Sequence, residues 1–240
     1  MIKLSVVIPV FNEQKRFKKE FKNYYDFFKK QKYSWEIIIV NDGSTDKTLS
    51  IIKNQIRSKT NIKLVSYERN KGKGFAISEG MKNTSGKYVL FCDIDQSVPI
   101  ATVNSFFKHF KNGSDVVIGS RRVKGAKILI HQPKVREFLG RGFTALVSTF
   151  IYKGIKDSTC GFKAFKNEAS KTIFSRVSVY DWAFDAEILF ICKKKKIKVA
   201  QSPVTWSDVR GSKVSIKKDV PRSLKGLVKI HFNNVLGKYD

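Results

Sequence analysis

Short β-branched runs alternate with stretches of helical periodicity along this chain. The runs predict strands over residues 3–10, 36–41, 62–67, 87–92 and 115–119. Between the first two, aromatic residues recur at helical spacing and give one helix an apolar face, namely Phe17, Phe21, Tyr24, Tyr25 and Phe28. Further helices are predicted at 46–58, 74–83, 100–111, 137–152 and 182–194. This order predicts an α/β fold with a mostly parallel central sheet and helices on both faces.

The length and composition fit one domain, residues 1–215, followed by a basic tail. A chain of 240 residues, 42% of them hydrophobic, can bury one substantial core. Residues 216–240 place Leu224 and Val228 among Lys225 and Lys229, the pattern of an amphipathic helix that lies in a bilayer interface. Ordinary packing is the alternative, as it is for the apolar segment 138–152. No run reaches the roughly 18 apolar residues of a spanning helix, so we expect membrane contact to be peripheral.

The charge balance favours anionic partners without choosing among them. Lys and Arg number 47 against 20 Asp and Glu, a net charge of +27. Such a field attracts nucleotide sugars, nucleic acids and acidic lipid headgroups alike. The three cysteines and three histidines lack the spacing of a disulfide framework or a zinc site.

Acidic residues follow three of the predicted strands. Glu13 comes shortly after the first, Asp42 ends the second, and Asp93 and Asp95 follow the fourth. Ligands of open α/β sheets bind beyond the carboxyl ends of the strands. We therefore expect these carboxylates to meet at one edge of the sheet.

The two acidic motifs allow different interpretations. After Asp42, Gly43 permits a tight turn and residues 44–46 can cap the next helix, but this structural role does not include Asp42 itself. Its carboxylate can accept a hydrogen bond from a nucleotide base. Asp93 and Asp95 suit Mg²⁺, which binds a few carboxylates together with substrate phosphate oxygens. An Asp-x-Asp sequence alone is weak evidence because turns are rich in Asp.

The chain resembles the inverting family 2 glycosyltransferases of GT-A fold over nearly its whole length. The resemblance lies in residues 6–13, 36–46, 69–74, 93–95 and 119–121. Within the family it is most similar to dolichyl-phosphate glucosyltransferases, with the related mannosyltransferases second, through residues 157–163, 182–189, 204–206 and 211–213. Those mannosyltransferases often have Gln two positions after the second Asp, where this chain has Ser97. This difference favours glucose.

The resemblance implies a single GT-A (Rossmann-like) domain and roles for particular residues. The implied nucleotide-sugar site comprises Pro9, Val10, Phe11, Glu13, Asp42, Gly43, Ser44, Lys73, Gly74 and Asp93. Asp95, with Asp93, would bind Mg²⁺ or Mn²⁺. Cations are needed at the departing diphosphate, for which Lys73 and Lys213 are candidates. The other expected catalytic side chains are Arg121 and Arg136.

The acceptor decides which further groups are needed. An acceptor phosphate is already ionised near pH 7 and needs cations rather than a general base. Arg121, Arg136, Ser212 and Lys213 are the candidates to bind it. A hydroxyl acceptor would need a carboxylate base, which Asp185 or Glu187 could provide; alternatively, 182–189 is simply a core helix.

The sequence therefore predicts an enzyme that transfers a hexose, glucose from UDP-glucose, to a polyprenyl or dolichyl phosphate. We expect it to act peripherally at the cytoplasmic face of a membrane, on an anionic surface and without nucleic acid, and leave open a membrane-protein partner. One alternative is a family 2 enzyme that glycosylates a sugar hydroxyl in cell-surface polysaccharide. The other is a non-catalytic basic module that binds nucleic acid or membrane.

Overall fold

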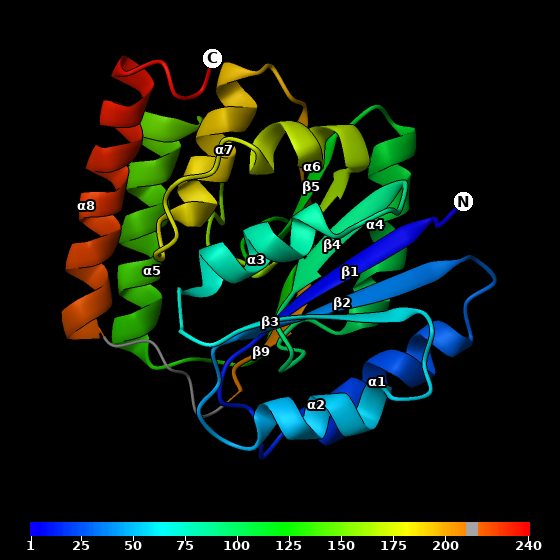
Figure 1. Ribbon diagram of the computed structural model, residues 1–240. Helices are drawn as coiled ribbons and strands as arrows, with labels where there is room; N and C mark the ends of the chain where they lie inside the picture. Colours follow the sequence, from blue (N-terminus) through cyan, green and yellow to red (C-terminus); the bar gives the residue numbers. More distant parts are fainter. Residues whose placement is uncertain (210–215) are drawn as a thin grey trace.

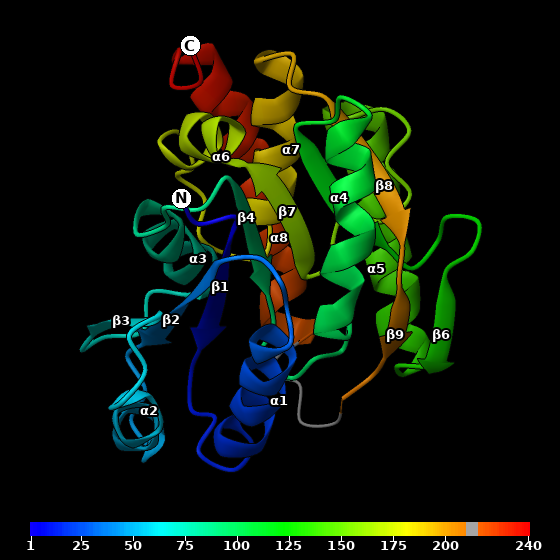
Figure 2. The same cartoon turned by 90° about the vertical axis from the view of Figure 1, so that its right-hand side faces the viewer.

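A seven-stranded sheet forms the centre of the molecule, in the order β3-β2-β1-β4-β7-β5-β8 (Figures 1 and 2). The computed structural model describes residues 1–209 and 216–240, and only the backbone of 216–219. The strands of the sheet are β1 (Leu4–Val10), β2 (Trp35–Asp42), β3 (Ile62–Tyr67), β4 (Tyr88–Cys92), β5 (Val116–Ser120), β7 (Phe162–Lys166) and β8 (Val199–Pro203). A second, two-stranded sheet pairs β6 (Lys127–Ile130) with β9 (Thr205–Ser207). The five predicted strands are present with boundaries shifted by one residue at most.

Helices cover both faces of the sheet, as predicted (Figure 1). Side chains alternate along β1, so Val6 and Ile8 pack towards one layer and Val7 towards the other. The first layer contains α1 (Phe17–Lys29), α2 (Thr48–Ile56) and α4 (Val103–Lys111), which follows the short 3₁₀ helix Ile100–Thr102. The second contains α3 (Lys73–Lys82), α6 (Asn167–Phe174) and α7 (Phe184–Lys194). The aromatic face of α1 is core, with Phe17, Tyr24 and Phe28 fully buried.

The second half of the chain departs furthest from the prediction. The unpredicted strand β7 lies between β4 and β5 and is antiparallel to both. Its sequence, Phe162-Lys-Ala-Phe-Lys, has a lysine at a buried position, so hydrophobic periodicity alone does not reveal it. The helix predicted at 137–152 begins earlier, as α5 (Lys134–Leu146), and continues as a π-helical turn over Val147–Ile151.

The C-terminal segment packs onto the main domain. Helix α8 (Ile216–Val235) contacts α7, and it lies beside α5 in both ribbon views (Figures 1 and 2). Ile230 and Tyr239 are fully buried and belong to the same core cluster as β1 and α7. Residues 216–240 thus contribute to the core, and their role as a membrane-interface tail stays a prediction. No helix within 1–209 or 216–240 is long and apolar enough to cross a membrane.

Candidate active site

A cleft of about 820 Å³ opens at the carboxyl ends of β1, β2 and β4. It brings the three acidic segments together, because Glu13, Asp42, Asp93 and Asp95 all line it. The other predicted site residues in its lining are Pro9, Val10, Phe11, Lys73, Arg121 and Arg136. Residues separated by more than a hundred positions therefore share one concave surface. Ser212 and Lys213, the remaining predicted phosphate ligands, lie outside the described residues.

The Asp42 carboxylate holds one wall of the cleft in place. Its Oδ1 accepts hydrogen bonds from the Tyr67 hydroxyl at 2.8 Å and the Lys71 backbone N–H at 2.8 Å. Its Oδ2 accepts from Asn70 Nδ2 at 2.8 Å and the Gly72 N–H at 3.1 Å. Four donors match the four lone-pair positions of a carboxylate. Asp42 thus has a structural role that the sequence interpretation did not give it, and contact with a base stays a prediction.

Gly43, Ser44 and Gly74 support the walls of the cleft and are absent from its lining within the described part of the chain. Gly43 has φ +62°, and an added Cβ would overlap the backbone of Arg69 and Asn70. Ser44 Oγ accepts the Asn12 N–H at 2.9 Å. The Gly74 N–H donates to the Tyr180 carbonyl at 3.2 Å. Their implied role at the nucleotide sugar stays a prediction.

Asp93 and Lys73 form an ion pair in the cleft. Lys73 Nζ lies 2.5 Å from Asp93 Oδ1, and the two side chains are 27% and 35% exposed. Burial lowers the pKa of Lys73, but the charge of Asp93 outweighs it and leaves this pKa above its ordinary value. The Tyr24 hydroxyl donates to the Asp93 carbonyl at 2.7 Å, so α1 fixes the backbone here. Lys73 therefore places a positive charge next to the acidic pair.

Gly161 lies directly against this ion pair. A Cβ added to it would overlap Asp93 Oδ2 and lie 3.2 Å from Lys73 Nζ. The absence of a side chain at Gly161 therefore lets the 157–161 loop, which connects to β7, pack closely against the Asp93 carboxylate.

Asp95 has the chemistry of a ligand for a hard cation. Its Oδ1 accepts two hydrogen bonds from Ser97, from the hydroxyl at 2.6 Å and the backbone N–H at 3.0 Å. This turn fixes the carboxylate at the cleft. No group of three or more His, Cys, Asp or Glu side chains gathers as a metal site in the described residues. Mg²⁺, however, is commonly bound by one or two carboxylates plus substrate phosphates, so Asp95 and Asp93 fit such an ion.

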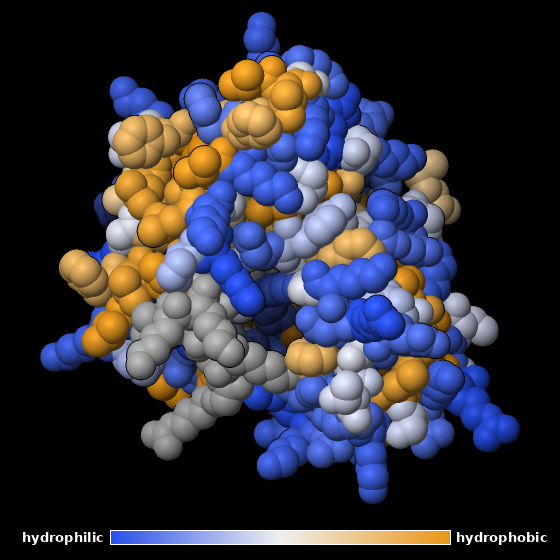
Figure 3. Space-filling model, turned by 60° about the vertical axis from the view of Figure 1, so that its left-hand side comes forward, coloured by the Kyte–Doolittle hydropathy of each residue, from blue (hydrophilic) through white to orange (hydrophobic). Residues whose placement is uncertain are grey.

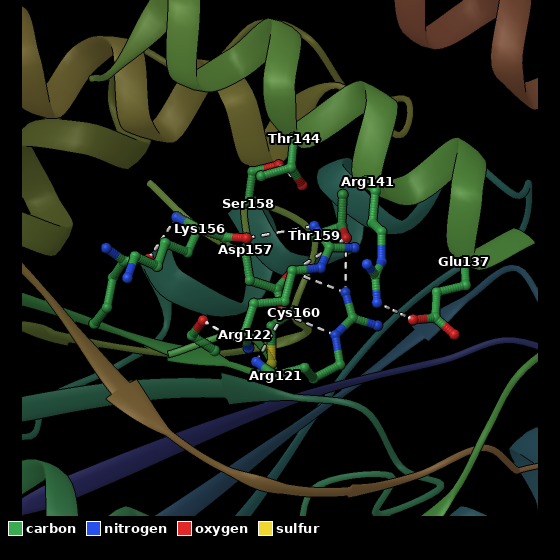
Figure 4. A network of polar contacts seen from close by, with 12 residues as sticks. Arg121, Arg122, Glu137, Arg141, Thr144, Lys156, Asp157, Ser158, Thr159 and Cys160 are labelled. Carbon is green, nitrogen blue, oxygen red and sulfur yellow. Dashed lines mark hydrogen bonds and ion pairs between the residues drawn. The ribbon is translucent and has the colours of Figure 1, made fainter. Parts of the chain in front are cut away.

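Arg121 is held by a buried carboxylate (Figure 4). Its Nε and Nη2 donate to the two oxygens of Asp157 at 2.7 and 2.8 Å, and its backbone N–H donates to Oδ2 at 2.9 Å. Nη2 also donates to Thr159 Oγ1 at 2.9 Å, and the guanidinium lies 5.3 Å from the Trp206 ring centroid. Burial raises the pKa of Asp157, but Arg121 outweighs it and this pKa lies below its usual value. Arg121 is therefore a rigid cation in the cleft wall.

Arg136, on α5, is the less restrained cation. Its Nη1 is 4.0 Å from Asp208 Oδ1, and its side chain is 31% exposed. Because a loose pair at this distance contributes little stability, Arg136 can reorient towards an anion in the cleft.

The structure places neither candidate base in the cleft lining. Glu187 is fully buried, and its carboxylate accepts hydrogen bonds from Ser178, the Val179 N–H and the Tyr239 hydroxyl. Asp185 is 5% exposed and lies 2.5 Å from the buried Lys163 Nζ. Burial raises the pKa of Asp185. Both acids are paired or hydrogen-bonded inside the core, so this geometry does not support either as a base, and that role stays a prediction.

Sequence analysis assigned no site role to several other residues in the lining. They include Asp181, Trp206, Asp208 and Arg222. Asp181 Oδ1 accepts the Ala183 N–H at 2.7 Å at the start of α7, and an acidic residue directly before an apolar helix was an available signal. Arg222 belongs to α8, so treating 216–240 as a separate tail concealed it.

The fold and the cleft define a glycosyltransferase of GT-A type. Residues 5–174 match the model of glycosyl transferase family 2. This chain belongs to that family.

Relatives and solved structures agree with the assignment. The dolichyl-phosphate beta-glucosyltransferase of Dictyostelium discoideum is 34% identical over 248 residues, covering 98% of this chain and 76% of its own. That of Saccharomyces cerevisiae is 35% identical over 255 residues, with the same two coverages of 98% and 76%. Glucosyl-3-phosphoglycerate synthase from Mycobacterium tuberculosis, in complex with Mn²⁺, UDP-glucose and phosphoglyceric acid, superposes with a TM-score of 0.67 at 17% identity, covering 95% of this chain and 79% of that one. At this identity the superposition shows the fold alone.

Proposed function

We propose that this glycosyltransferase moves glucose from UDP-glucose to the phosphate of a dolichyl or related polyprenyl phosphate, with inversion at the anomeric carbon. The observation that carries the proposal is a cleft whose lining joins an acidic pair to arginines from two helices with exposed apolar surface. The names of the relatives at 34% and 35% identity support glucose and dolichyl phosphate as substrates.

The donor end of the cleft is the region of Asp93, Asp95 and Lys73. Asp95, with Asp93, would hold Mg²⁺ or Mn²⁺, which neutralises charge on the departing diphosphate. Lys73 supplies a second positive charge at the same place, because its Nζ lies 2.5 Å from Asp93 Oδ1. Preorganised charges of this kind stabilise a transition state in which a diphosphate departs. The pocket residues from β1 and its following loop, among them Pro9 and Phe11, are then available to the nucleoside.

The acceptor end is the region of Arg136, Arg121 and Arg222. A phosphate monoester is largely ionised at neutral pH, and its oxygen can attack the anomeric carbon without a base. Asp185 and Glu187 are not among the residues that line the cleft, whereas Arg121, Arg136 and Arg222 are, and these arginines can bind a phosphate. We assign the main contact with the phosphate to Arg136, because it is less restrained than Arg121. Arg121 instead helps to form the wall of the cleft.

The lipid part of the acceptor is accounted for by the apolar surface beside the cleft. In Figure 3 hydrophobic residues gather on the side of the molecule that carries α5 and α8. On α5 Val135 and Phe138 are 62% and 74% exposed, and on α8 Val228 and Phe232 are 71% and 60% exposed. The same two helices supply Arg136 and Arg222 to the cleft. We propose that this surface rests in the cytoplasmic face of an anionic membrane, where exposed lysines of α8 contribute about 1 kcal/mol each.

Transfer assays with a matrix of donors and acceptors test the proposal. Purified protein with Mn²⁺ is incubated with UDP-glucose, GDP-mannose or UDP-N-acetylglucosamine, each with dolichyl phosphate, dolichol or a free sugar as acceptor. Mass spectrometry should detect a glucosylated lipid phosphate only from UDP-glucose with dolichyl phosphate. Product from the free sugar would instead support a hydroxyl acceptor, and no product from any pair would reject the proposal.

A further inference from the structure

The buried lysine of β7 has a place in the structure that the reaction described above does not use. Lys163 lies in register with Phe91 on one neighbouring strand and Ile118 on the other, in the middle of the sheet. Its side chain has no solvent exposure. Burying an ammonium group is costly unless it is paired and fully hydrogen-bonded. A lysine here therefore needs a reason beyond packing.

All three donors of the Lys163 ammonium have partners. Nζ donates to Asp185 Oδ1 at 2.5 Å, to the Cys160 carbonyl at 2.7 Å and to the Ser158 carbonyl at 3.1 Å. Asp185 belongs to α7, whereas the two carbonyls belong to the loop before β7. One cation thus ties the backbone of this loop to a helix on the far side of the sheet from α1.

The same loop contacts both ends of the cleft, Arg121 at the acceptor end and Asp93 at the donor end. Thr159, between the two tethered carbonyls, accepts a hydrogen bond from Arg121 at 2.9 Å. Gly161, immediately after Cys160, lies so close to Asp93 that a Cβ would overlap its carboxylate. A small movement of the 158–161 backbone therefore changes the position of Asp93 directly.

We propose that Lys163 is a positioning residue for the donor site: it fixes the 158–161 loop, and the loop sets the Asp93 carboxylate against Lys73. This assignment deepens the proposed function and rests on it for the catalytic readout, though not for the structural one. It gives a role to the segment 157–163 that resembles the dolichyl-phosphate glucosyltransferases.

The test replaces the buried pair by apolar side chains. Lys163→Met alone leaves the Asp185 carboxyl without its cation, so the main variant is Lys163→Met with Asp185→Leu, because replacing both partners of a buried pair is often tolerated. The control is Lys166→Met, a lysine of the same strand paired with Asp115 and 36% exposed away from the cleft. Melting temperatures establish that both variants are folded.

The first readout is amide hydrogen exchange in the donor-free protein. The double variant should exchange about tenfold faster or more at residues 158–161 and 93–97, with α1 and α2 unchanged. The Lys166→Met variant should match the wild type. Unchanged exchange at 158–161 in a folded double variant would overturn the proposal, whether or not the protein uses UDP-glucose.

The second readout is catalytic and separates positioning from general stability. With UDP-glucose, Mn²⁺ and dolichyl phosphate, kcat should fall on the order of 10-fold to 100-fold, because small misplacements of catalytic groups are that costly. Asp93→Asn should lower kcat by a much smaller factor in the double variant than in the wild type, because both changes act on the same carboxylate. Independent, multiplicative losses would contradict the assignment. If the wild type shows no turnover, the proposed function is rejected. Hydrogen exchange then decides the proposal for Lys163 by itself.

Discussion

The close approach of Gly161 to Asp93 offers a test through a single methyl group. Gly161→Ala would place a Cβ 3.1 Å from Asp93 Cγ. The same Cβ would overlap Asp93 Oδ2, because the two atoms would be closer than non-bonded atoms approach in proteins. The Asp93 backbone cannot yield easily, because the Tyr24 hydroxyl holds its carbonyl at 2.7 Å. The carboxylate must therefore withdraw, and restoring an ordinary contact of 3.4 Å needs a displacement on the order of 1 Å. This shift also disturbs the ion pair with Lys73.

Misplacing a catalytic group by about 1 Å can cost about 100-fold in rate. That factor corresponds to about 2.7 kcal/mol of transition-state stabilisation. Steady-state kinetics with UDP-glucose and dolichyl phosphate should show kcat/KM falling by about this factor, with the fold intact by circular dichroism. Gly142→Ala is the matched control, because a Cβ there meets nothing within 4 Å. Its activity should equal that of the wild type. Full activity of Gly161→Ala would refute the importance of Asp93 placement.

Three further substitutions test other parts of the account. Lys73→Met removes the cation beside the departing diphosphate and should lower kcat about 100-fold in transfer assays; an unchanged kcat would exclude that role. Asp157→Asn leaves the buried Arg121 without its carboxylate and should destabilise the domain by about 3–5 kcal/mol in urea unfolding. Arg121 holds the pKa of Asp157 in the folded protein below its usual value of 3.8. The stability that this ion pair contributes is therefore fully present above pH 3.8 and is lost as the pH falls through the pKa of Asp157 in the folded protein. An Asp157→Asn variant as stable as the wild type at pH 7 would contradict this role of the Arg121–Asp157 pair. Val228→Asp should weaken co-sedimentation with phosphatidylserine vesicles at unchanged melting temperature, and undiminished binding would argue against the apolar face.

The first half of the fold could be predicted from local pattern, and the second half could not. Runs such as residues 37–40 are β-branched and buried on both faces of the sheet, and they therefore predict parallel strands. Strand β7 is short, antiparallel and contains the buried Lys163, whose partners come from α7 and from a loop. Only tertiary structure supplies those partners. The same holds for α8, whose burial depends on Ile230 and Tyr239 meeting α7 and its neighbours.

The candidate site, like the fold, could be predicted from the sequence only in part. Strand ends predict which carboxylates share an edge, so the meeting of Asp42, Asp93 and Asp95 at one cleft follows from topology. What each side chain contacts there does not follow. Spacing gave no sign that four donors from the 67–72 segment surround Asp42, or that Glu187 is enclosed by the C-terminal residues. Both depend on segments brought together by folding.

The most direct measurement is a calorimetric titration of UDP-glucose into the protein with Mn²⁺ and with EDTA. We expect saturable binding to the wild type with Mn²⁺, and a loss of at least about tenfold in affinity, roughly 1.4 kcal/mol, in EDTA or on Asp95→Asn. The control Asp26→Asn alters a carboxylate of α1 that is paired with Lys22 and should bind like the wild type. Equal affinity of the wild type and Asp95→Asn, with and without the metal, would contradict a metal-bound nucleotide sugar in this cleft.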